Sequence, residues 1–207
     1  MYSLISSFFS YFKSKVTLIS FILILFFIDT VSFSEEKLKN IILLQNGLID
    51  ISKNKNKDFL RSTLILVEKT YNSEKMIRMI IGKEWNEFSQ SQKKQIHKVF
   101  LEYISLNYNK RFRKINEPNF QIDGKKKIGE KYFYVQTSLI IKGQEKVEIN
   151  YLLNQTEKKE WKIFDVLLAG SISEIATKKS EFSKIIKDKG IDHLIESLKK
   201  KNDELKN

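Results

Sequence analysis

The chain has 207 residues, of which 37 are Lys or Arg and 25 are Asp or Glu, and it contains no cysteine and one proline. Without cysteine there are no disulfides, no thiol catalysis and no cysteine-based metal sites, so packing alone must stabilise the fold. The formal net charge of +12 fits an anionic partner such as a lipid headgroup or a nucleic acid. The lysines are spread over the whole chain without an arginine cluster, however, and an A/T-rich coding bias explains their abundance equally well.

The N-terminus has the features of an export signal. Two lysines precede a mainly apolar run at 16–28, whose 13 residues suit a signal peptide and fall short of the roughly 20 that a membrane span needs. Ser32 and Ser34 occupy the positions that a signal peptidase reads, which predicts a signal peptide over 1–34 and a mature start at Glu35. The alternative is an uncleaved anchor, because the first twelve residues are also rich in aromatic side chains. Either way, the rest of the chain is expected to lie beyond the cytoplasm.

Residues 36–112 have the apolar spacing of helices. Stripes at intervals of three and four predict several helices in succession. Ser73 is expected to cap a short helix that ends near Gly82. Ser89 and Gln92 have the spacing of a capping box, which predicts that a longer helix begins there.

Over 119–169 the apolar period becomes two, as it does in strands. The alternation predicts an antiparallel meander of about four strands, with a turn at Gly143 and a weaker first strand near Phe120. Helical spacing returns over 172–206 and is interrupted at Gly190. Helices, a meander and helices again predict an α+β fold. We expect a curved antiparallel sheet of about four strands, covered by N-terminal and C-terminal helices, in a single domain over 35–207.

No pattern in the chain is typical of an enzyme. Gly170-Ser171-Ile172-Ser173 lacks the second glycine of a nucleophile elbow. His97 and His193 are the only histidines, and both are expected on the solvated surface. No spacing indicates a metal site and no glycine-rich loop could hold a phosphate, so we predict neither catalysis nor a cofactor.

Asp165 is the one polar residue of interest on the strands. It shares an alternation with Trp161, Ile163 and Leu167, which predicts that it points inward. One interpretation is a structural carboxylate that accepts hydrogen bonds from backbone amides or caps a helix. The other is a polar marker at the rim of a cavity.

Several short motifs follow one another in an order that resembles the MlaC family, also called the toluene-tolerance auxiliary family. The matching segments are YNSEKMIRM (71–79), GKEW (82–85), SQSQKK (89–94), INYL (149–152), WKIFDVLLAGSI (161–172), ATKKSEF (176–182) and KGIDHLI (189–195). Two departures lie at one corner of the chain. Ala169 stands where the family usually has Glu, and Ser171 resembles a one-residue insertion.

The resemblance implies the periplasmic phospholipid-binding component of an ABC transport system. Such a carrier encloses acyl chains and shuttles lipid between an outer-membrane lipoprotein complex and an inner-membrane ABC transporter complex, which maintains outer-membrane lipid asymmetry. It implies no catalysis, no nucleic acid and only transient proximity to a membrane. The alternative is a lipid-free periplasmic adaptor that binds another protein through the same apolar groove.

The resemblance also implies a cavity between sheet and helices, large enough to reach or exceed the upper part of the usual ligand-pocket range of roughly 300–1,000 Å³. The residues expected to line it are Met76, Met79, Ile80, Trp85, Phe100, Tyr103, Ile104, Val135, Leu139, Ile149, Tyr151, Ile163, Leu167 and Phe182. All of them could equally be ordinary core residues.

Overall fold

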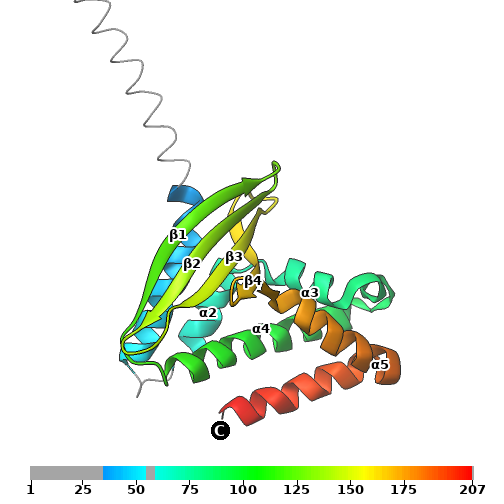
Figure 1. The fold of residues 1–207 in the computed structure, drawn as a ribbon. Helices are drawn as coiled ribbons and strands as arrows, with labels where there is room; N and C mark the ends of the chain where they lie inside the picture. Colours follow the sequence, from blue (N-terminus) through cyan, green and yellow to red (C-terminus); the bar gives the residue numbers. More distant parts are fainter. Residues whose placement is uncertain (1–34, 55–58, 207) are drawn as a thin grey trace, which may run out of the picture. The chain divides into compact units, whose positions relative to one another are not determined.

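The computed structural model describes residues 35–54 and 59–206. The chain divides into two units, Met1–Lys39 and Asn40–Asn207, and the architecture that follows is that of the second unit (Figure 1). The expected signal peptide lies outside the described residues. Within the described ranges, no helix is both long enough and apolar enough to cross a membrane.

Helices form the first part of this unit, as the spacing predicted. A helix that includes residues 40–53 comes first. It is followed by α2 (Leu60–Thr70), α3 (Ser73–Ile81), the 3-10 helix η1 (Gly82–Glu87) and α4 (Gln90–Phe112).

Local sequence sets the ends of these helices. The predicted capping box is confirmed, because Ser89 Oγ accepts a hydrogen bond from Gln92 N at 3.2 Å while Gln92 Oε1 accepts one from Ser89 N at 3.0 Å. The cap of α3 lies one residue earlier than predicted, since the Asn72 side chain accepts the hydrogen bond that Ser73 was expected to accept. α3 ends at Ile81 and is followed by Gly82, whose φ of 80° suits a residue without a Cβ atom.

The strands form one antiparallel sheet in the order β1-β2-β3-β4-β5. They are β1 (Pro118–Ile128), β2 (Tyr132–Ile141), β3 (Val147–Gln155), β4 (Trp161–Leu168) and β5 (Ile172–Ser173). The α+β class is therefore confirmed, with five strands in the described part of the chain where about four were predicted.

The additional strand, β5, lies where the sequence predicted the start of a helix. Ala169 and Gly170 adopt φ of 47° and 79° and turn the chain back on itself. Leu167 then pairs with Ser173 before the last helix begins.

A β-bulge changes the face of β4 half way along its length. Leu153 pairs with Ile163 and Leu152 pairs with Asp165, so Phe164 is an extra residue on the β4 side. Beyond the bulge, Val166 continues the face of Ile163, because it pairs with Tyr151 and Tyr151 shares a face with Leu153. The predicted alternation is therefore wrong beyond Ile163: Asp165 and Leu167 lie on the opposite face of the sheet.

The junction between α2 and α3 ties the helical part to β4. Tyr71 forms an isolated bridge with Ile163, and Asn72 N donates a hydrogen bond to Ile163 O at 2.7 Å. The helix at 40–53 is attached to the same strand, since Asn40 Nδ2 donates to Trp161 O at 2.7 Å. These bonds place the start of α3 beside the sheet.

The last helix, α5 (Glu174–Lys206), is interrupted at Gly190, where φ and ψ are 81° and 172°. This interruption was predicted from the position of the glycine. The C-terminal part of α5 runs alongside α4 (Figure 1), where Asn202 Nδ2 donates to Val99 O at 3.0 Å. The side chains of Leu194 and Leu198 are buried on this part of the helix.

Candidate functional site

An apolar cavity of about 490 Å³ lies between the sheet and helices α3, α4 and α5. Strands β1 to β4 and the three helices all contribute to its lining. Aliphatic and aromatic side chains form most of that lining, and its charged members are Arg111 on α4 and Glu174 and Lys178 on α5.

The cavity brings together many of the predicted lining residues. Those that line it are Met76, Ile80, Phe100, Tyr103, Ile104, Leu139, Ile149 and Tyr151. That these side chains contact lipid stays a prediction.

The other predicted lining residues lie elsewhere, for three physical reasons. Val135, Ile163 and Phe182 are core residues with exposures of 0%, 0% and 4% and do not line the cavity. Leu167 is turned to the opposite face of the sheet by the bulge in β4. Met79 and Trp85 instead line a second, polar groove on the other side of α3.

Sequence reasoning missed several residues that do line the cavity. Val166 and Leu168 were missed because the bulge could not be seen in the alternation. Tyr71 and Tyr108 were assigned to helical stripes and not to the cavity. The spacing of Phe100, Ile104, Tyr108 and Arg111 at three and four is the signal that could have placed Tyr108 in the lining.

The side chains that α4 contributes to the cavity lining become more polar toward the C-terminal end of the helix. Phe100, Ile104, Tyr108 and Arg111 line it in turn, so the wall passes from aromatic through aliphatic and phenolic to cationic along about three turns of helix. The aromatic rings continue onto β1, where Phe112 and Phe120 stack with their centroids 6.1 Å apart.

Four tyrosines contribute phenol groups to this apolar lining, namely Tyr71, Tyr103, Tyr108 and Tyr151. The hydroxyls of Tyr71 and Tyr108 hydrogen-bond to each other. Burial raises the pKa of Tyr108 to about 12, and it raises the pKa values of Tyr71 and Tyr151 as well. These three phenols are therefore neutral near pH 7, where they act as hydrogen-bond donors and not as anions.

The cavity opens between α4, the start of β3 and the turn that precedes α5. The exposed lining residues mark this mouth, namely Arg111, Val147, Ala169 and Thr177. Both departures from the family pattern, at Ala169 and Ser171, fall in or beside the turn at the mouth.

Asp165 anchors the start of α5 and does not lie at the rim of the cavity. Its Oδ1 accepts hydrogen bonds from Ile175 N at 3.2 Å and Val166 N at 2.8 Å, and its Oδ2 accepts one from Ser173 Oγ at 2.6 Å. The Asp165 side chain is 6% exposed. The interpretation as a structural carboxylate that accepts from backbone amides is therefore confirmed.

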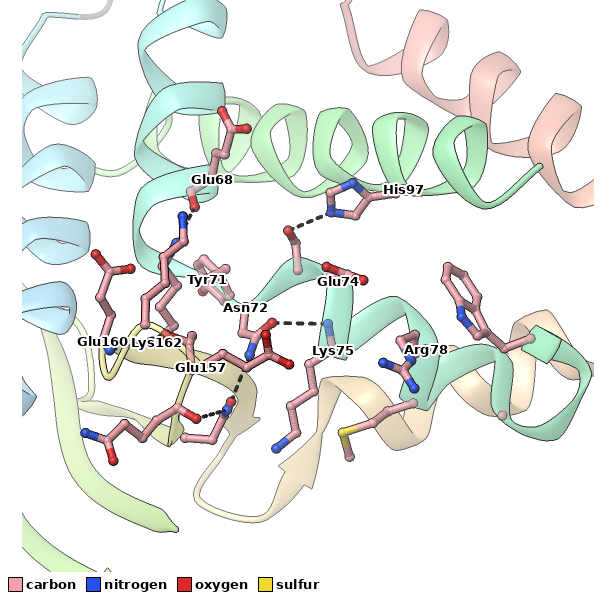
Figure 2. Close-up of a pocket in the computed structure, with 18 of the residues that line it drawn as sticks. Glu68, Tyr71, Asn72, Glu74, Lys75, Arg78, His97, Glu157, Glu160 and Lys162 are labelled. Carbon is pink, nitrogen blue, oxygen red and sulfur yellow. Dashed lines mark hydrogen bonds between the residues drawn. The ribbon is translucent and has the colours of Figure 1, made fainter. Parts of the chain in front are cut away.

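The polar groove, on the opposite side of α3, is an open space of about 1,120 Å³ (Figure 2). Its rim carries charged side chains of both signs, namely Lys75, Arg78, Lys158, Lys162, Lys179, Glu68, Glu74, Glu157 and Glu160. No ion pair found among the described residues involves any of them. Lys75 Nζ instead lies 4.2 Å from the ring centroid of Phe164.

The groove contains a serine–histidine pair, which could in principle belong to a catalytic triad. Ser73 Oγ and His97 Nε2 are 2.9 Å apart, and Figure 2 shows this bond at the upper edge of the groove. Ser73 is only 6% exposed. No carboxylate of the described residues hydrogen-bonds to the other ring nitrogen, as a triad would require. The pair therefore has the features of a structural hydrogen bond.

His97 also corrects an expectation. Partial burial lowers its pKa, although Glu74 and Glu68 act in the opposite direction, so His97 lies at the surface, as predicted, but is less solvated than expected. His193 is exposed, as predicted. Over the described parts of the chain, no cluster of His, Asp or Glu could hold a metal ion.

Comparisons with known proteins agree with this architecture. The family model described as "MlaC protein" matches residues 44–200. The fold is similar to the solved structure of a phospholipid-binding protein from Ralstonia solanacearum in complex with a phospholipid. The TM-score is 0.71 at 17% sequence identity, and the match covers 83% of this chain and 99% of that one. At this identity the likeness shows the fold alone. No curated protein matches the chain.

Proposed function

The chain belongs to the MlaC family, and from this premise we propose that it is a periplasmic carrier of phospholipid. It encloses acyl chains in the cavity between the sheet and helices α3, α4 and α5. It takes lipid from one membrane complex and delivers it to another, between an outer-membrane lipoprotein complex and an inner-membrane ABC transporter complex, and so maintains outer-membrane lipid asymmetry. It performs no catalysis and needs no cofactor.

The cavity is the observation that carries this proposal. Each methylene of an acyl chain costs about 0.8 kcal/mol to expose to water, and a diacyl lipid has on the order of 30 of them. A carrier must therefore cover the chains with apolar surface and leave the headgroup at a polar opening. The apolar lining and the mouth beside Arg111 have this arrangement. The solved structure with a similar fold is of a phospholipid-binding protein, which adds support.

The volume of the cavity sets a condition on the proposal. At about 490 Å³ it lies in the lower half of the usual ligand-pocket range of roughly 300–1,000 Å³, below the size expected for a diacyl lipid. Two acyl chains therefore require that the cavity widen on loading. One enclosed chain requires no such movement.

Lipid extraction of the protein purified from cells tests the proposal. Mass spectrometry of the extract, and native mass spectrometry of the intact protein, should find phospholipid in stoichiometric amount. The added mass gives the number of acyl chains. Protein that is always free of lipid and co-purifies with another protein would overturn the carrier in favour of the lipid-free adaptor.

Export is proposed on the sequence of the first 34 residues and on the family. Sequencing of the mature N-terminus should read Glu35. A protein that keeps Met1 and fractionates with membranes would replace the cleaved signal peptide with an anchor, and the carrier would then act from the membrane surface.

A further inference from the structure

Three of the described residues that line the cavity are charged, and all three lie on the helices that flank its mouth: Arg111 on α4, and Glu174 and Lys178 on α5. Lys178 already has a partner, because its Nζ lies 2.8 Å from Glu181 Oε2. Arg111 and Glu174 are not paired with each other, and neither takes part in an ion pair with any described residue. The mouth therefore presents one cation and one anion that are both available to a ligand.

Both charges line the same cavity as a bonded pair of phenols. The hydroxyls of Tyr71 and Tyr108 are bonded to each other and line the cavity with Arg111 and Glu174. Burial is the main cause of the raised pKa of Tyr108, and beyond it Glu174 adds to the rise while Arg111 opposes it. Glu174 also raises the pKa of Tyr71. Tyr108 is therefore influenced by both charges, and the four side chains form one polar zone of the cavity lining.

We propose that this zone selects zwitterionic phospholipids, with the phosphate held at Arg111 and the ammonium group of the headgroup facing Glu174. The inference rests on the proposed function, since it concerns the headgroup of the lipid that the cavity is proposed to hold. Of two hydroxyls bonded to each other, only one supplies its proton to the bond. The tyrosine pair therefore keeps one donor for an ester carbonyl of the lipid, between the phosphate and the apolar interior.

An anionic headgroup does not match the charges at the mouth, because it has no cationic group to face Glu174. A lipid whose headgroup carries the phosphate charge and no ammonium group still pairs with Arg111, but it leaves Glu174 beside a net negative ligand. Like charges in one partly buried site repel each other. Glu174 thus favours the lipid with an ammonium group and disfavours the anionic one.

A position at the start of a helix does not by itself explain Glu174. A carboxylate in the first turn is favoured by the helix dipole, and Glu174 is the first residue of α5. The amides there already have acceptors, however, because Asp165 accepts from Ile175 N and Ser173 Oγ accepts from Ala176 N at 3.0 Å. A purely structural role would change stability and leave the choice of lipid unchanged.

The test is a competition between two headgroups with the same acyl chains. The purified protein is incubated with vesicles that contain equal amounts of phosphatidylethanolamine and phosphatidylglycerol, both with deuterated chains so that only newly bound lipid is counted. The protein is then separated from the vesicles and its lipid is quantified by mass spectrometry. The wild type should be enriched in phosphatidylethanolamine by roughly fourfold, as expected for one partly exposed charge contact.

Glu174→Gln should bring that ratio close to one, and Arg111→Gln should lower the uptake of both lipids by a similar factor. The matched controls are Glu196→Gln on α5 and Lys110→Gln on α4, two exposed positions that do not line the cavity. A wild type that takes up both lipids equally, or a ratio unmoved by Glu174→Gln, would overturn the selection but leave the carrier intact. A wild type that takes up neither lipid would overturn the carrier itself.

Discussion

Helix α3 separates two regions with opposite physical character. On one side Met76 and Ile80 line a cavity that is almost wholly apolar, and its phenol groups are hydrogen-bonded or buried. On the other side Lys75 and Arg78 line an open polar groove whose charges make no ion pairs in the described part of the chain (Figure 2). Burial thus decides whether a polar group needs a fixed partner: the phenols enclosed in the cavity need one, whereas charged side chains at the open groove and at the mouth of the cavity do not.

The largest expected effect comes from reversing the polarity of the cavity side of α3. Ile80 is 1% exposed, so Ile80→Asp places an unpaired carboxylate in the apolar interior, at a cost of several kcal/mol. We expect a large drop in thermal stability and loss of bound lipid. Met79→Asp is the matched control on the groove side, where the side chain is 38% exposed, and it should change stability by less than about 0.5 kcal/mol. Equal effects of the two changes would contradict the conclusion that α3 separates an apolar cavity from a polar groove.

A second pair of changes separates the cavity lining from the tightly packed core. Ile149 lines the cavity and is partly exposed, whereas Val135 is 0% exposed and does not line it. We expect Ile149→Asp to fold with reduced lipid retention, because the carboxylate faces the acyl chains. Val135→Asp should abolish folding instead. Circular dichroism and lipid extraction distinguish these results, and an Ile149→Asp protein that keeps its full lipid content would mean that the acyl chains do not reach β3.

The carboxylate that anchors α5 should have an intermediate effect. Asp165→Ala removes the acceptor for Ile175 N and Val166 N, which leaves two buried donors without a partner at a cost of about 1–3 kcal/mol. Because α5 forms one wall of the cavity, lipid should also be released faster. Chemical denaturation and a lipid-release assay measure both effects. The control is Asp192→Asn, which touches only an exposed hydrogen bond to Gln92. Unchanged stability in Asp165→Ala would show that the start of α5 is held by other contacts.

The smallest effects concern pH, and the two regions should respond at opposite ends of the scale. The raised pKa of Tyr108, about 12, means that folding favours the neutral phenol. The stability it contributes is complete below the ordinary tyrosine pKa of about 10 and is lost between about pH 10 and 12. The lowered pKa of His97 means that folding favours the neutral imidazole, so stability declines as pH falls below about 6.5.

Denaturation curves measured across this pH range would test both signs. His97→Gln should remove the acid-side decline and leave the alkaline side unchanged, while Tyr108→Phe should reduce only the alkaline loss. An acid-side decline that persists unchanged in His97→Gln would assign it to the carboxylates of the groove instead.

Local patterns in the sequence determined the element types of this protein. The change of period from helical to two near Pro118, the capping box at Ser89 and the break at Gly190 each depend on a few neighbouring residues, and each is confirmed. The order of motifs along the chain was sufficient to predict the family, because it depends on spacing and not on contacts.

Only the tertiary structure decided which apolar residues line the cavity and which are core. Val135 and Leu139 share one face of β2, yet only Leu139 lines the cavity, while Val135 is fully buried. An alternation of period two cannot distinguish these two positions. The bulge at Phe164 exchanged the faces of β4 beyond it, since one extra residue reverses every later position in a pattern of period two. The meeting of Arg111 and Glu174 at one mouth joins residues that are distant in sequence, so it depends on how α4 and α5 pack and not on any local pattern.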